Sequence, residues 1–192
     1  FGVQAQLSSG LSMPTQFSAI LVYVLYVVLI SPLVEEVVFR GIILNSMRRF
    51  GDSFALLVSA LLFALFHGNL IQAPNAFLMG LVIGYFVLCT GSLWTGVLIH
   101  MVNNALVLLW NSLSLVIPPS WYALFQLVIM AVYLVVGIVS FLTLVRVRPN
   151  MFMFIRSSTY STERIKYRTF FSSVTLVVAL TLLVLGILRN LT

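Results

Sequence analysis

Residues 31–41 read Ser31-Pro32-Leu33-Val34-Glu35-Glu36-Val37-Val38-Phe39-Arg40-Gly41 and put two adjacent carboxylates and an arginine inside a long apolar run. A charge at the centre of a bilayer costs about 2.5–3.5 kcal/mol on insertion scales, so this cluster indicates a functional site. On a helix, Glu36 and Arg40 share one face, whereas Glu35 points about a quarter turn away. We therefore expect Arg40 to neutralise Glu36 and Glu35 to face a polar cavity. The alternative is a buried ion pair that only fixes helix packing.

The composition defines the class of protein. Hydrophobic residues make up 61% of the 192 residues and charged residues only 7%, against about 25% charged residues in soluble domains. We predict an all-α, polytopic membrane protein built as a bundle of transmembrane helices, because spanning segments must satisfy their backbone groups internally. The continuous apolar runs disfavour a β-barrel. The net charge of +6 does not indicate nucleic acid, because the basic residues lie beside hydrophobic runs, as in cytoplasmic membrane anchors.

The chain divides into a polar N-terminal segment, residues 1–16, and a single helical domain, residues 17–192, whose motifs fall within 31–110. Six helices are predicted, at 17–49 with an interruption or kink at Pro32, and at 54–67, 74–90, 93–115, 121–145 and 170–188. Because the chain begins with Phe1 rather than methionine, we also expect a longer natural protein with an N-terminal portion before this chain.

Basic residues predict the orientation in the membrane. Arg48 and Arg49 form one basic turn, and residues 146–168 form a basic loop. Four predicted helices lie between them, an even number, so both should lie on one side, which the positive-inside rule makes cytoplasmic. We expect an integral protein of a bacterial cell membrane, with its site open to the cytoplasm.

Polar residues of three predicted helices fall at a similar depth. At about 1.5 Å per helical residue, the estimated distances from the helix ends are roughly 18 Å for Glu36, 21 Å for His67, 12 Å for His100 and 18 Å for Asn104. Either histidine alone could be a hydrogen-bonded core or helix-end group. Because both lie near the level of both carboxylates, we expect the groups to converge on one site.

This set of residues suits a particular chemistry. Two carboxylates, an arginine, two imidazoles and a carboxamide, without a well-placed serine or cysteine nucleophile, favour activation of water by a general base beside donors for an oxyanion. Zinc held by Glu35, His67 and His100 is one alternative. We expect no metal, because Glu36 would then have to be the base, and the charge of Arg40 makes it a poor one. A non-catalytic immunity or scaffold protein, or a proton-coupled transporter, is the alternative from another class.

Three motifs resemble those of a known family. Glu35-Glu36-x3-Arg40, Phe63-x3-His67 and His100-x3-Asn104 occur in the order found in the CAAX protease and bacteriocin-processing family, also called the ABI family, of intramembrane endopeptidases. The resemblance spans about residues 20–110 and implies a fold of eight transmembrane helices, whereas six are counted here. It also implies a membrane-associated peptide or protein substrate, either prenylated or linked to bacteriocin processing or immunity.

The resemblance also implies a role for each motif residue. Glu35 would be the general base, and His67 would help it activate the attacking water. Glu36 and Arg40 would support and orient Glu35. His100 and Asn104 would stabilise the oxyanion of the tetrahedral intermediate.

Overall fold

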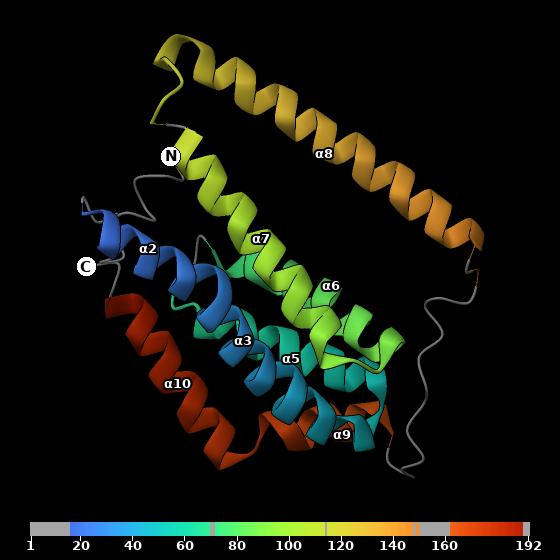
Figure 1. The fold of residues 1–192 in the computed structure, drawn as a ribbon. Helices are drawn as coiled ribbons and strands as arrows, with labels where there is room; N and C mark the ends of the chain where they lie inside the picture. The colour runs from blue at the N-terminus through green and yellow to red at the C-terminus, as the bar shows by residue number, and fades with distance from the viewer. Residues whose placement is uncertain (1–15, 70–71, 114, 148, 150–161, 190–192) are drawn as a thin grey trace. The chain divides into compact units, whose positions relative to one another are not determined.

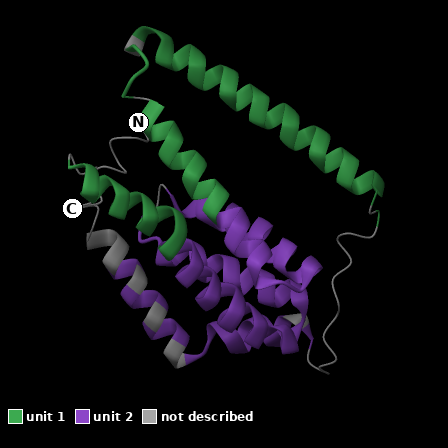
Figure 2. Ribbon diagram, viewed as in Figure 1, with its two compact units in different colours: residues 1–30, 101–154 green, residues 31–100, 155–192 purple. Residues whose placement is uncertain are grey.

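The computed structural model describes residues 16–69, 72–113, 115–147, 149 and 162–189 (Figure 1). Most of these residues are helical and none forms a strand, which confirms the predicted all-α fold. Residues 1–15 of the predicted polar segment lie outside the described residues, as do residues 148 and 150–161 of the predicted basic loop. The chain divides into two compact units, residues 1–30 with 101–154 and residues 31–100 with 155–192 (Figure 2).

The first long helix runs from Phe17 to Phe50 and carries both carboxylates. It consists of α2 (Phe17–Leu25), a π-helical turn η1 (Tyr26–Ile30), α3 (Ser31–Glu36), a π-helical stretch η2 (Val37–Leu44), α4 (Asn45–Met47) and a 3-10 turn η3 (Arg48–Phe50). Pro32 is the second residue of α3, which follows η1. The proline ring crowds the preceding helical turn, and proline has no N–H to donate to it. The wider π-helical turn accommodates both effects. The irregularity predicted at Pro32 thus takes the form of π-helical turns in a helix that continues.

In the second unit, α5 (Asp52–Phe66) packs closely on α6 (Ala73–Thr90). Gly80 of α6 lies against Ala60 of α5, so closely that a Cβ atom at Gly80 would be 3.0 Å from the Cα atom of Ala60. Small residues at a helix crossing allow such a close approach of two backbones in membranes. The η2 stretch of the first helix packs against α5. The crossing of α5 and α6 therefore also brings the backbone of α6 near the first helix.

The core of this unit is aromatic. Phe39 of η2 and Phe63 of α5 are buried and meet edge to face, with ring centroids 5.2 Å apart. The hydroxyl of Ser59, also buried, donates a hydrogen bond of 2.8 Å to the carbonyl of Phe39. The bond ties α5 to the π-helical stretch, where backbone carbonyls have irregular partners. Phe39 and Phe63 therefore hold the helix of the carboxylates against α5.

Helix α7 (Leu93–Leu113) belongs to both units, because the division falls after His100. In the first unit, the Asn104 carboxamide donates a 3.0 Å hydrogen bond to the carbonyl of Val27 in η1. Trp110 of α7 stacks on Phe125 of α8 (Pro119–Val147), with ring centroids 5.4 Å apart. These contacts join α7 to the other helices of that unit.

Two further helices complete the second unit, α9 (Glu163–Phe171) and α10 (Val174–Arg189). Lys166 of α9 is buried, and its ammonium donates a 2.8 Å hydrogen bond to the carbonyl of Phe50 at the end of the first long helix. A cation at a helix C-terminus is favourable because the last carbonyls lack partners there. This bond brings α9 to the end of the helix that carries Arg48 and Arg49.

Four described helices are long and apolar enough to cross a membrane: Phe17–Phe50, Ala73–Thr90, Leu93–Leu113 and Ser120–Val147. The bent pair of α9 and α10 adds a fifth if it counts as one span. Helix α5 has 15 residues, about 22 Å, which is short of the ~30 Å hydrocarbon core. The predicted count of six is therefore approximate. The chain is an integral, multi-pass membrane protein.

Candidate active site

A buried ion pair lies in the middle of the first long helix. Arg40 donates from Nη1 to Oε1 of Glu36 at 2.9 Å, and both side chains are 0% exposed. Its Nη2 donates to the carbonyl of Gly80 at 3.1 Å. The i, i+4 pair predicted from the sequence is thus present, and α6 adds an acceptor that holds the guanidinium in place. Such pairing offsets the large cost of removing two charges from water.

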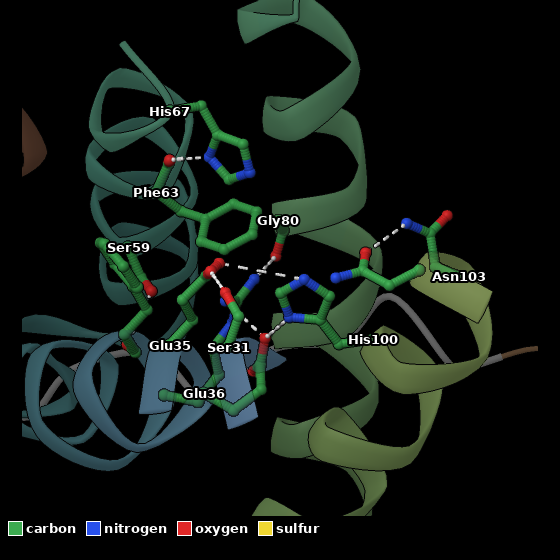
Figure 3. Close-up of polar contacts among 12 residues, drawn as sticks. Ser31, Glu35, Glu36, Ser59, Phe63, His67, Gly80, His100 and Asn103 are labelled. Carbon is green, nitrogen blue, oxygen red and sulfur yellow. Dashed lines mark hydrogen bonds and ion pairs between the residues drawn. The ribbon is translucent and has the colours of Figure 1, made fainter. Parts of the chain in front are cut away.

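Phe63 contacts several of the charged and polar groups. The guanidinium carbon of Arg40 lies 4.4 Å from the centroid of its ring. The same ring meets His67 edge to face at 4.7 Å and His100 at 5.6 Å (Figure 3). A cation over an aromatic face is attracted by the ring quadrupole. Phe63 therefore forms an apolar wall that separates the two histidines.

His100 of α7 lies against both carboxylates (Figure 3). Its Nδ1 is 2.9 Å from Oε1 of Glu36, and its Nε2 is 3.9 Å from Oε2 of Glu35. The carboxylate of Glu36 accepts, so Nδ1 of His100 carries a proton. Glu36 therefore fixes the orientation of this imidazole and points its Nε2 toward Glu35.

Glu35 is the more exposed of the two carboxylates, with 17% of its side chain accessible against 0% for Glu36. Its Oε1 accepts a hydrogen bond from the hydroxyl of Ser31, one turn earlier in α3. Its Oε2 is buried and has no hydrogen-bond partner in the protein. Oε2 of Glu36 is also unpaired, but Glu35 combines an unpaired oxygen with an accessible side chain, which suits a reacting group.

His67 follows the end of α5, and its Nδ1 is 2.8 Å from the carbonyl of Phe63. A carbonyl can only accept, so Nδ1 is the donor and Nε2 of the neutral ring is an acceptor. The described hydrogen bonds join His67 to Phe63 and not to Glu35. The histidine within 4 Å of Glu35 among the described ion-pair contacts is His100, to which the family resemblance gives the oxyanion role.

The structure brings together Glu35, Glu36, Arg40 and His100 in the second unit, with His67 joined to them through Phe63. Asn104 belongs to the first unit. Its carboxamide oxygen accepts from Asn103 at 3.3 Å, and its nitrogen donates to Val27. Both polar ends of Asn104 are therefore engaged within its own unit. Its place relative to the carboxylates stays a prediction.

The described residues contain no group of three or more His, Cys, Asp or Glu side chains placed to hold a metal ion. The zinc alternative needs Glu35, His67 and His100 as one such group. In this structure Nδ1 of His67 faces the carbonyl of Phe63, and Nδ1 of His100 faces Glu36. A histidine that ligates a metal through Nε2 commonly donates from Nδ1 in this way, so a site without metal stays a prediction.

Sequence reasoning missed three residues that shape the site: Ser31, Gly80 and Gly96. Ser31 could have been found, because a hydroxyl four residues before Glu35 lies on the same helical face. A Cβ atom at Gly96 would be 2.8 Å from Cγ2 of Val87 and 3.0 Å from Oε2 of Glu36, so glycine there allows α7 its close approach to the carboxylate. Nothing local to Gly80 or Gly96 signals these roles, because both depend on packing between helices.

Two comparisons with known proteins show what the region around this site is similar to. Residues 17–106 match the family described as type II CAAX prenyl endopeptidase Rce1-like. This region holds all three sequence motifs. The match agrees with the resemblance drawn from the motifs: residues 17–106 are similar to this family.

One relative can be named. The chain is 31% identical over 100 residues to the membrane-embedded CAAX protease MroQ of Staphylococcus aureus (strain USA300). The match covers 48% of this chain and 40% of that protein, so the chain matches less than half of the relative's length. No solved structure matches the chain.

Proposed function

We propose that this protein is an intramembrane endopeptidase that hydrolyses a peptide bond with a water molecule activated by Glu35. The observation that carries the proposal is the unpaired Oε2 of Glu35, 3.9 Å from Nε2 of His100 in a buried charged cluster. A carboxylate with an unpaired oxygen can take a proton from water. The family match and the named relative, both CAAX proteases, support the same activity.

The charge balance of the cluster assigns its protons. Glu35, Glu36 and Arg40 together carry a net charge of −1 when both carboxylates are ionised. A buried cluster is most stable when it is neutral, because desolvation penalises net charge. One more proton, on Nε2 of His100, brings the cluster to zero and leaves Glu35 ionised as the base. His100 then donates through Nδ1 to Glu36 and through Nε2 toward the reacting carbonyl.

The reaction follows from these assignments. Glu35 takes a proton from water as the water oxygen bonds to the scissile carbonyl carbon, and the carbonyl oxygen becomes negative. The Nε2 proton of His100 stabilises this oxyanion, a contribution worth about 10²–10³ in rate for a single donor elsewhere. Glu35 then passes its proton to the leaving amine as the carbon–nitrogen bond breaks. Water supplies the oxygen and both hydrogens that the products gain, OH on the acyl product and H on the amine.

The other motif residues have supporting roles in this proposal. With Nδ1 of His67 turned to the carbonyl of Phe63, its Nε2 can accept the second hydrogen of the attacking water. Asn104 would add a second oxyanion donor, as the family resemblance implies. Glu36 and Arg40 position His100 and keep the cluster neutral. No step requires a metal ion.

The position in the membrane is also a proposal. Lys166 and Phe50 are joined by a hydrogen bond, so the basic residues of α9 and Arg48 and Arg49 lie at the same end of the unit. The positive-inside rule makes that end cytoplasmic. The named relative is bacterial, which supports a bacterial cell membrane. We propose cleavage near the boundary between membrane and cytoplasm, on a membrane-associated peptide or protein.

A cleavage assay tests the proposal. The purified protein is incubated with a prenylated CAAX peptide and, separately, with a bacteriocin leader peptide, and products are identified by mass spectrometry. Glu35→Gln preserves shape and the Ser31 contact but cannot take a proton, so we expect at least a thousandfold slower cleavage with an unchanged melting temperature. If Glu35→Gln cleaves at the wild-type rate, Glu35 is not the base. If the wild-type protein cleaves neither peptide nor other membrane peptides, a non-catalytic role replaces the protease.

The role of His100 needs a second readout. As an oxyanion donor, His100 acts only while Nε2 keeps its proton, so His100→Gln should lower the rate and remove the alkaline limb of the pH profile. As a base, its loss would remove the acid limb instead. A loss of about 10²–10³ with the acid limb retained supports the donor role, and loss of the acid limb contradicts it.

A further inference from the structure

Helix α9 has two chemically distinct faces. Arg164, Arg168 and Phe171 are exposed and follow one another at i, i+4 and i+7, so they form one stripe along the helix. Ile165 is exposed beside this stripe, with 54% of its surface accessible. The side chain of Lys166 lies on the opposite, buried face. Arginines beside large apolar side chains on one exposed surface suit a membrane interface, where the apolar groups can enter the acyl boundary and the arginines can reach the headgroups.

The buried face attaches α9 firmly to the rest of its unit. Lys166 donates to the carbonyl of Phe50, and Phe54 of α5 meets Tyr167 and Phe170 with ring centroids 4.9 and 5.5 Å away. The charge of Lys166 is therefore engaged with a helix end. Arg164 and Arg168 point away from these contacts.

Further positive charge lies at the helix end that α9 covers. Arg49 is exposed, and its guanidinium carbon is 4.8 Å from the centroid of the Phe50 ring. Arg48 pairs with Asp52 at 2.8 Å. The chain from α9 into α10 bends by 65°. If α10 runs along the membrane normal, α9 is therefore strongly inclined to it, as an interfacial helix is.

We propose that the exposed face of α9, together with Arg49, binds the headgroup of an anionic phospholipid. The arginines would contact the phosphate, since the planar guanidinium matches phosphate oxygens in a bidentate manner. Ile165 and Phe171 would enter the acyl region beside it. This apolar pair favours a lipid over an acidic protein, because it lies on the same face as the charges. The inference does not depend on the protease activity.

A binding assay on the full chain tests this site. Purified protein in a neutral detergent is titrated with a fluorescent phosphatidylglycerol and, in parallel, with the matching phosphatidylcholine. We expect tighter binding of phosphatidylglycerol, and a loss of about fivefold in its affinity for each of Arg164→Gln and Arg168→Gln. Arg146→Gln is the control, because Arg146 is an exposed arginine at the end of α8.

The possible outcomes are decisive. Selective loss in the two α9 variants, with melting temperatures unchanged and Arg146→Gln like wild type, supports the site. Equal affinity of the wild-type protein for both lipids overturns it, as does an equal loss in the Arg146 control. Displacement of the lipid by inorganic phosphate or by an acidic peptide alone would assign the face to that ligand instead.

Discussion

Replacement of Arg40 by methionine tests whether its charge is what stabilises Glu36. Methionine fills much of the space of arginine, so the cavity cost stays small. The substitution leaves a carboxylate that is 0% exposed without its cation, and the carbonyl of Gly80 without its donor. Breaking a buried pair in this way costs about 3–5 kcal/mol. At about 2–4 °C per kcal/mol for a chain of this size, the melting temperature should fall by roughly 6–20 °C.

A double substitution separates charge from packing. Glu36→Gln in the Arg40→Met background removes the second charge and keeps an oxygen that can accept from Nδ1 of His100. Replacing both partners of a buried pair is often nearly neutral. We therefore expect the double variant to regain at least half of the lost stability.

The assay is thermal unfolding of the full chain in one detergent, with cleavage measured on the same samples. If Arg40→Met melts like wild type but no longer cleaves, Arg40 acts on the substrate rather than on Glu36. If the double variant melts as low as Arg40→Met, the loss comes from packing on Phe63 and the charge argument is wrong.

Three further predictions follow from the site. Gly96→Ala places a methyl group 3.0 Å from Oε2 of Glu36, so cleavage should fall at least tenfold. The control is Gly137→Ala, where a Cβ atom has nothing within 4 Å, and this variant should cleave like wild type. Equal effects of the two substitutions would refute the role of Gly96. Ser31→Ala should lower kcat about 10- to 100-fold and shift the pH profile, with KM unchanged. Ser31→Thr should restore kcat. An unchanged kcat and pH profile in Ser31→Ala would contradict the contact with Glu35. Chelators should leave cleavage unchanged; stoichiometric zinc whose removal stops cleavage and whose return restores it would overturn the metal-free mechanism.

The sequence predicted the contacts that depend on one helix. The pair of Glu36 and Arg40 follows from their i, i+4 spacing, and the greater exposure of Glu35 follows from its different direction on the same helix. The fold class follows from composition, because a chain with 7% charged residues can satisfy its backbone in a bilayer only with helices or a closed barrel.

Contacts between helices could not be predicted in the same way. The depth estimate separates Glu36 from His100 by roughly 6 Å, yet Nδ1 of His100 is 2.9 Å from Oε1 of Glu36. Helix tilt and the π-helical turns on both sides of α3 change the depth of each residue, and neither is visible in a count of residues. The contact of Arg40 with the carbonyl of Gly80 likewise depends on how closely α6 approaches, which Gly80 and Ala60 decide together.

The two arginine ion pairs described in the second unit differ in their contact with water. The pair of Glu36 and Arg40 is 0% exposed under the ring of Phe63, whereas in the pair of Arg48 and Asp52 the arginine side chain is 40% exposed. Dissolved ions screen charges that face water over about 8 Å at physiological ionic strength, and they screen buried pairs much less. A rise in salt therefore loosens the basic end of the unit while the charge balance around Glu35 stays the same. Changes in the salt content of the cell should therefore have little effect on the charges around Glu35.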